Sequence, residues 1–93
     1  MRVIEKAMVD AINAKKNMQR DNTRVVYYPD TNTSGVFLYG HHIGTFMHIT
    51  GTFRPDIETL ERWPTPTTKS RLRALGVKVY TKAGKTYLND KEV

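Results

Sequence analysis

Three histidines lie close together in the sequence, at His41, His42 and His48. Histidine is a common metal ligand and the usual acid–base group near neutral pH. If residues 42–49 form a strand, His42 and His48 share a face but lie about 20 Å apart along it. One metal ion, with bonds of about 2 Å, cannot reach both rings. We therefore expect no metal site and no cofactor, and we interpret these histidines as turn and surface residues, of which His41 or His42 could contact a phosphate or a partner.

The acidic and hydroxyl side chains do not form a recognisable catalytic pattern. Asp56, Glu58 and Glu61 form an acidic cluster. On a helix the first two carboxylates would diverge, whereas acid–base or two-metal chemistry needs them paired. Ser34 and Ser70 lie in no nucleophile motif, and the sequence has no glycine-rich phosphate-binding loop. We therefore expect a protein that is not an enzyme.

The strongest functional signal is a basic segment near the C-terminus. Seven Lys or Arg residues and no acid lie between Glu61 and Asp90, in a chain of formal net charge +6. Such an excess of positive charge favours nucleic acid or another anionic partner. The segment predicts a short helix and a hairpin that together form a basic surface. The predicted nucleic-acid contacts are Lys69, Arg71, Arg73, Lys78, Lys82 and Lys85, with Trp63 as a stacking residue.

Aromatic residues in the predicted strands support a second interpretation. Because side chains alternate across a strand, some of the aromatic residues must be partly exposed. Exposed rings stack on bases or anchor protein interfaces. The alternative function is therefore an inhibitor or adaptor that binds a host protein through the face around Tyr27, Phe37 and Tyr39, or through an added edge strand. An exposed edge strand could also pair two copies of the chain.

The elements that position these residues follow from the sequence periodicity. Apolar residues at Ile4, Met8 and Ile12 predict an amphipathic N-terminal helix, and β-branched and aromatic runs predict the strands that follow. The expected elements are a helix over 3–18, strands over 24–28, 36–39, 42–49 and 52–54, a helical turn over 56–62, a helix from its N-cap at Thr67 to Gly76, and a hairpin of 77–80 with 86–88. The turns are placed at 31–35 and at Gly40–His41. We summarise this order as α-β-β-β-α-β-β, an α+β fold with a helix, an antiparallel meander, a short capped helix and a terminal hairpin.

Length and composition limit the class of protein. Ninety-three residues with an apolar fraction of 39% predict one domain over 1–93. The absence of cysteine excludes disulfides and thiolate metal sites, which fits a reducing cytosol. No segment approaches the ~20 apolar residues that a membrane helix needs, and the N-terminus is unlike a secretory leader. We expect a cytoplasmic protein that does not bind membranes.

Three sequence blocks form a recurrent pattern. They are Leu-x-Gly-x-x-Ile-Gly, then Trp-x-Thr-x-Thr-Thr-Lys-Ser-Arg-Leu-x-Ala-Leu, then Gly-Lys-x-Tyr-Leu-Asn. The matching residues are Leu38, Gly40, Ile43 and Gly44; Trp63, Thr65, Thr67, Thr68, Lys69, Ser70, Arg71, Leu72, Ala74 and Leu75; and Gly84, Lys85, Tyr87, Leu88 and Asn89. The pattern resembles a group of small bacteriophage proteins, which usually have Asn at the position of Arg73. The resemblance implies a phage origin and an accessory or host-takeover role in the bacterial cytoplasm.

Overall fold

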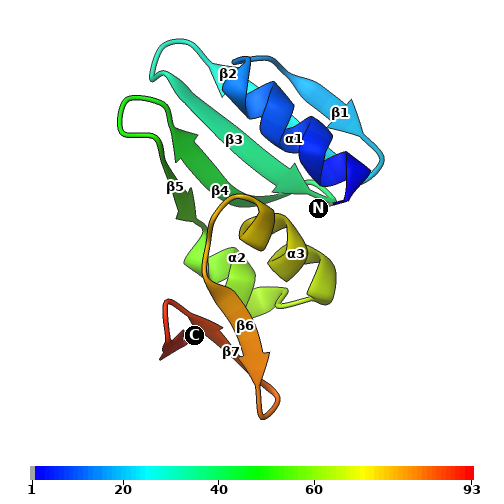
Figure 1. The fold of residues 1–93 in the computed structure, drawn as a ribbon, viewed down its shortest axis with the longest axis vertical. Helices are drawn as coiled ribbons and strands as arrows, with labels where there is room; N and C mark the ends of the chain where they lie inside the picture. The colour runs from blue at the N-terminus through cyan, green and yellow to red at the C-terminus, as the bar shows by residue number, and fades with distance from the viewer. Residues whose placement is uncertain (1) are drawn as a thin grey trace.

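The chain forms two antiparallel sheets joined by helices, in a computed structural model that describes residues 2–93 (Figure 1). The elements are α1 (Val3–Asn13), β1 (Met18–Arg20), β2 (Thr23–Tyr28), β3 (Thr33–Leu38), β4 (His41–Met47), β5 (Thr52–Pro55), α2 (Ile57–Arg62), α3 (Pro66–Ala74), β6 (Val79–Lys82), β7 (Lys85–Leu88) and β8 (Lys91–Glu92). The predicted α+β class is confirmed. No helix within residues 2–93 is both long enough and apolar enough to cross a bilayer.

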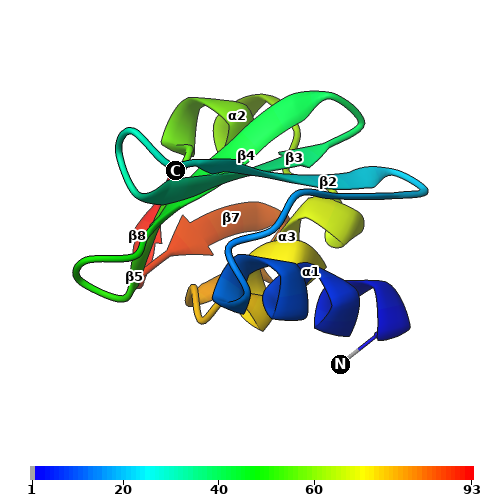
Figure 2. The same ribbon diagram turned by 90° about the horizontal axis from the view of Figure 1, so that it is seen from above.

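The larger sheet is a meander in which strands adjacent in sequence are adjacent in space, in the order β1-β2-β3-β4-β5. The β3–β4 turn has Tyr39 and Gly40 at φ of 51° and 79°. Positive φ at both central residues gives the turn type whose twist matches that of a hairpin. Helix α1 packs on one face of the sheet and buries Met8 and Ile12 with Val25. Figure 2 shows α1 and α3 on the same side of this sheet.

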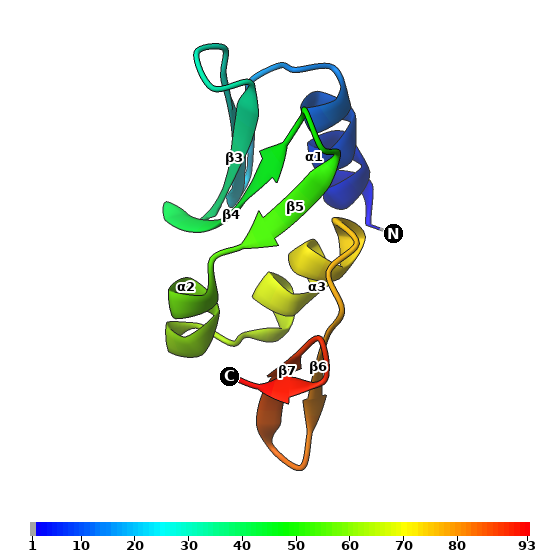
Figure 3. The same ribbon diagram turned by 90° about the vertical axis from the view of Figure 1, so that its left-hand side faces the viewer.

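Helices α2 and α3 lie between the two sheets along the length of the molecule (Figure 3). Leu60 of α2, Leu72 of α3 and Val79 of β6 are buried in the same core cluster as the residues beneath α1. Gly76, two residues after the end of α3, terminates the helix and has a φ of 86°. The Gly76 and Val77 amides donate to the carbonyls of Arg73 and Leu72, both at 3.0 Å. These two bonds form a Schellman cap, so the predicted role of Gly76 is confirmed.

A buried ion pair joins α1 to α3. Arg71 is 3% exposed, and its Nη1 donates to Glu5 Oε2 at 2.8 Å, while its Nε donates to Thr23 Oγ1 at 3.1 Å. Ser70 Oγ donates to the same carboxylate at 2.5 Å. Burial raises the pKa of Glu5, but hydrogen bonds from Ser70, the Arg2 amide and Arg71 together hold it below its ordinary value. The carboxylate therefore stays ionised and keeps α1, β2 and α3 together.

Several predicted boundaries were wrong. The first helix ends at Asn13, and residues 18–20 form β1 at the edge of the sheet. Strand β3 begins at Thr33, inside the segment that we assigned to a turn, and the hairpin turn is Tyr39–Gly40. The short strand β8 also pairs with β7. The observed order is therefore α-β-β-β-β-β-α-α-β-β-β.

The N-cap of α3 also differs from the prediction. Thr65, and not Thr67, caps this helix, because Thr65 Oγ1 accepts from the Thr68 amide at 3.1 Å. Pro66 occupies the first helical position, where its missing N–H leaves no unsatisfied donor.

Candidate functional site

One face of the five-stranded sheet carries no helix over β2 and β3. Figures 2 and 3 show α1 on the opposite side. The strand register fixes which side chains point to the uncovered side, because residues paired across strands share a face. We call this surface the open face. Its residues are Arg24, Val26 and Tyr28 of β2; Thr33, Gly35 and Phe37 of β3; His42, Thr45 and Met47 of β4; and Thr52 and Arg54 of β5.

Two aromatic rings meet over a glycine at the centre of the open face. A methyl group placed on Gly35 would lie 3.1 Å from Phe37 Cε1 and 3.2 Å from Tyr28 Cε2. Any larger residue at position 35 would therefore push the rings away from the sheet. Tyr28 is 43% exposed, and Phe37 is half-buried. Gly35 thus allows both rings to pack against the backbone with part of their surface in contact with solvent.

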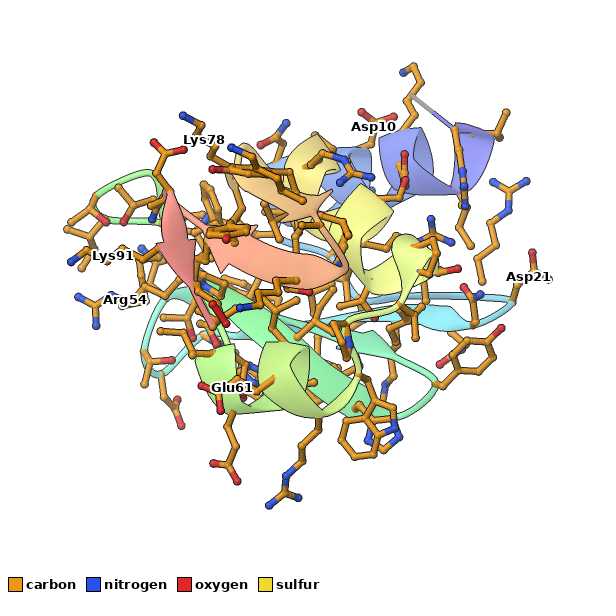
Figure 4. All side chains as sticks on the ribbon, turned by 90° about the horizontal axis from the view of Figure 1, so that it is seen from below. Asp10, Asp21, Arg54, Glu61, Lys78 and Lys91 are labelled. Carbon is orange, nitrogen blue, oxygen red and sulfur yellow. The ribbon has the colours of Figure 1, made fainter. Side chains whose placement is uncertain are left out.

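Two arginines flank these rings. Arg24 lies opposite Phe37 in the β2–β3 pair, and Arg54 lies opposite Thr45 in the β4–β5 pair. Both side chains are exposed, and neither has an ion-pair partner among residues 2–93. Figure 4 shows Arg54 pointing away from the molecule. Arg54 is in register with Thr45, Gly35 and Val26, so Arg24 lies three strands away and two residues further along the strand. With strands about 4.8 Å apart and about 3.4 Å per residue, the two arginines lie about 16 Å apart, with Gly35 and its rings between the two strands that carry them.

Two shallow hollows continue across the open face. One, of about 520 Å³, includes Arg24, Phe37 and the acidic Asp21 in its lining. The other, of about 500 Å³, includes His42 and Arg54. Phe37 and His42 separate them, with ring centroids 5.4 Å apart in an edge-to-face arrangement. The hollows and the rings together form an extended track from β2 to β5.

A β-bulge in β4 places a histidine on this track. Val36 pairs with Gly44 but Phe37 pairs with His42, so Ile43 is an extra residue in β4. The extra residue shifts the alternation of side chains, and His42 and Thr45 consequently lie on the same face although they are three residues apart. The Ile43 carbonyl accepts the Asp56 amide at 2.8 Å, which ties the bulge to the start of α2.

His42 connects a hydroxyl group to a carboxylate. Its Nε2 lies 2.9 Å from Thr45 Oγ1, and its Nδ1 lies 2.8 Å from Asp56 Oδ2. The hydrogen bond from His42 lowers the pKa of Asp56, with a partial offset from burial and further lowering by the Thr59 amide. Asp56 also caps α2 by accepting from that amide at 3.1 Å. Asp56 and Glu58 diverge as expected, since Asp56 binds His42 while Glu58 pairs with Arg62 at 3.0 Å.

The order hydroxyl, imidazole, carboxylate is the order found in hydrolases with an activated nucleophile. Such enzymes also aim N–H donors at the oxygen that becomes negative. Here Thr45 is in the middle of an internal strand that pairs with β3 and β5, so ladder bonding occupies the nearby backbone groups. The N–H donors that acyl transfer requires are therefore not free near Thr45. The Thr45–His42–Asp56 arrangement is better suited to fixing the direction of its hydrogen bonds.

The predicted basic residues of α3 are mostly held inside the fold. Arg71 is in the buried ion pair with Glu5. Lys69 is buried and its Nζ donates to Thr81 Oγ1 of β6. Arg73 is exposed, and its Nη1 donates to the Val79 carbonyl at 3.1 Å. Burial leaves neither Lys69 nor Arg71 able to reach a phosphate.

The lysines of the C-terminal hairpin are exposed, but acids lie beside two of them. Lys78 Nζ lies 2.9 Å from Asp90 Oδ2, and Lys85 Nζ lies 3.6 Å from Glu92 Oε2. Lys78 points away from the molecule in Figure 4. Lys82 has neither an ion pair nor a side-chain hydrogen bond among residues 2–93. The charges of Lys78 and Lys85 are therefore compensated locally by neighbouring acids.

The predicted aromatic residues do not form one surface. Tyr27 faces away from Phe37, and its hydroxyl donates to Asn32 Oδ1 at 2.9 Å. Its neighbour Tyr28 lies beside Phe37 instead, as strand alternation allows. Tyr39 is at the β3–β4 turn and is 72% exposed.

Trp63, the predicted stacking residue, lies apart from both the hairpin and the open face. It is 40% exposed and stacks on His41, with centroids 4.0 Å apart and planes at 27°. The two rings border a small hollow of about 180 Å³ between the end of β3 and the start of α3. Part of the ring is already covered by His41, so Trp63 has less free surface than the sequence suggests.

A family model described as Kyanoviridae Gp96 protein matches residues 1–93. The chain belongs to this family. The predicted phage origin is therefore confirmed, whereas the three-block pattern as the mark of a phage protein group stays a prediction. Neither a curated protein nor a solved structure matches the chain. The match spans the residues of both the open face and the C-terminal hairpin.

Proposed function

We propose that this phage protein is a non-catalytic accessory protein that binds single-stranded nucleic acid on the open face. The observation that carries the proposal is the pair of rings, Phe37 and Tyr28, packed over Gly35 and flanked by Arg24 and Arg54, which have no ion-pair partner within residues 2–93. Stacking of a base on an aromatic side chain is worth about 1–3 kcal/mol. Guanidinium groups bind phosphates in bidentate geometry.

The arrangement favours single strands over duplexes. An aromatic ring on the surface of a sheet can stack only on a base that is not stacked between its neighbours in a duplex. Sheet-based RNA-binding domains bind unpaired bases in this way. Duplex binding would instead use many phosphate contacts, and the open face offers two arginines. The proposal therefore places the nucleic-acid contacts on the sheet, away from the helix and hairpin that the sequence indicated.

The affinity should depend on salt only moderately. For a single strand the slope of log K against log salt concentration is about −0.7 per phosphate contact, so two contacts give about −1.4. Raising the salt concentration fourfold should then weaken binding about sevenfold. A steeper slope would require additional cations, with Lys82 as the first candidate.

Host-protein binding is the alternative function. Val26 and Met47 add apolar area to the open face, and buried aromatic and methionine side chains are common at protein interfaces. Addition of an edge strand to the five-stranded sheet is less favoured, because β1 at one edge has only three residues and β5 at the other ends at Pro55, which cannot donate to a new ladder. Either function would operate in the cytoplasm of the infected bacterium.

The proposal can be tested by fluorescence anisotropy with labelled oligouridylate of about ten nucleotides. Arg24→Ala combined with Arg54→Ala should abolish the salt dependence and weaken binding at low salt. The matched control combines Lys82→Ala with Lys85→Ala on the hairpin, and it should bind within about twofold of the wild type. Loss of binding only in the hairpin variant would contradict the proposal. Absence of binding by the wild type would favour a protein partner.

A further inference from the structure

The hydrogen bonds around His42 have a defined direction. Asp56 is a carboxylate, because the hydrogen bond from His42 lowers its pKa, and a carboxylate can only accept. His42 Nδ1 must therefore carry the proton and donate to Asp56 Oδ2 at 2.8 Å. In the neutral ring the other nitrogen, Nε2, then has a free lone pair and accepts.

This direction determines what Thr45 presents to a ligand. Because His42 Nε2 accepts, the Thr45 hydroxyl donates its single proton to it across 2.9 Å. The oxygen of Thr45 is left with lone pairs only, so it can accept a hydrogen bond from a ligand but cannot donate one. A threonine hydroxyl that is free to rotate would do both. Asp56 and His42 thus convert Thr45 into an acceptor.

Thr45 also has a particular place on the open face. It pairs with Gly35 on one side, the residue under the two aromatic rings, and with Arg54 on the other. Neighbouring strands are about 4.8 Å apart. Across the sheet the aromatic rings therefore come first, the Thr45 oxygen second and the Arg54 guanidinium third. A nucleotide has its base, sugar and phosphate in the same order.

From this order we infer that the open face selects RNA over DNA, with Thr45 Oγ1 accepting a hydrogen bond from a ribose 2′-hydroxyl. The inference rests on the proposed function. A 2′-hydroxyl is the group that distinguishes the two nucleic acids, and deoxyribose offers no donor at that position. A hydrogen bond from a base amino group to Thr45 would not distinguish them.

The test compares three oligouridylates of equal length and different sugar, namely ribose, 2′-deoxyribose and 2′-O-methylribose, at about pH 8, where a free imidazole is neutral. The wild type should bind the ribose form about fivefold more tightly than the other two, which is the contribution of one net hydrogen bond. In Thr45→Val the ribose form should weaken to the level of the deoxyribose form, whose affinity should not change. Thr67→Val, the same substitution on α3 outside the open face, should keep the preference.

The outcomes separate this inference from the function on which it rests. Equal, measurable affinity of the wild type for the ribose and deoxyribose forms would overturn RNA selection and leave single-strand binding standing. A ribose preference that persists in Thr45→Val would also overturn the assignment to Thr45. Binding of none of the three oligonucleotides would overturn both.

Discussion

Replacing Arg71 should destabilise the fold, although Arg71 belongs to the most basic segment of the sequence. Its guanidinium donates to Glu5 at 2.8 Å and to Thr23 at 3.1 Å, and both members of the ion pair are almost fully buried. Removing one partner of a buried pair leaves the other charge uncompensated, which costs about 3–5 kcal/mol. A chain of this length has a total free energy of unfolding of roughly 5–14 kcal/mol. Arg71→Met should therefore remove a large part of the stability while keeping most of the side-chain packing.

Thermal unfolding followed by circular dichroism measures this loss. For a domain of this size 1 kcal/mol corresponds to about 4–8 °C, so Arg71→Met should lower the Tm by at least about 12 °C. Lys82→Met is the matched control, because Lys82 is exposed at the hairpin turn, and its effect should be within about 0.5 kcal/mol. The double variant Glu5→Leu/Arg71→Met should recover part of the loss, since neither charge is then buried alone. A Tm for Arg71→Met within about 2 °C of the wild type would refute the stabilising role of the Arg71–Glu5 pair. Arg71 would then again be a candidate contact for nucleic acid.

Three further predictions concern acid stability, packing and capping. The folded pKa of Glu5 lies below its ordinary value of 4.5, so its stabilising contribution is complete above that value and is lost as the pH falls through the folded pKa. In urea unfolding, the difference in stability between the wild type and Glu5→Gln should be constant from neutral pH to about pH 5 and should shrink below it. Gly44→Ala should unfold the protein or lower its Tm sharply, because the new methyl group would lie 2.3 Å from Phe53 Cζ and 2.6 Å from a backbone oxygen; a normal circular dichroism melt would contradict this. Thr65→Ala should cost about 1 kcal/mol through loss of the N-cap, and Thr67→Ala should cost less, so equal losses in urea titrations would count against the assignment of Thr65.

The sequence predicted those parts of the fold that depend on local signals. Gly76 ends α3 as expected, because the left-handed conformation there favours glycine. The N-cap was misassigned although a local signal was available, since Pro66 marks the first helical position and places the cap at Thr65. Strand β1 was missed because its three residues contain only one apolar side chain, Met18, and its pairing with β2 stabilises it.

The candidate site depended on contacts that are distant in sequence. Nothing local indicates that Arg71 is neutralised by Glu5, which lies at the other end of the chain. Nor does the sequence show the bulge at Ile43, which brings His42 and Thr45 to one face. The choice of Tyr27 in place of Tyr28 has the same origin, because adjacent residues of a strand face opposite ways and only the register shows which one joins Phe37.

The central claim is that the open face is the binding surface. Its most direct test is a two-dimensional ¹H–¹⁵N NMR titration of the labelled protein with oligouridylate. We predict that the amide signals that shift most will belong to residues 24–28, 33–37, 42–47 and 52–54. Small shifts there, together with large ones in residues 69–85, would contradict the claim and return the site to the helix and hairpin.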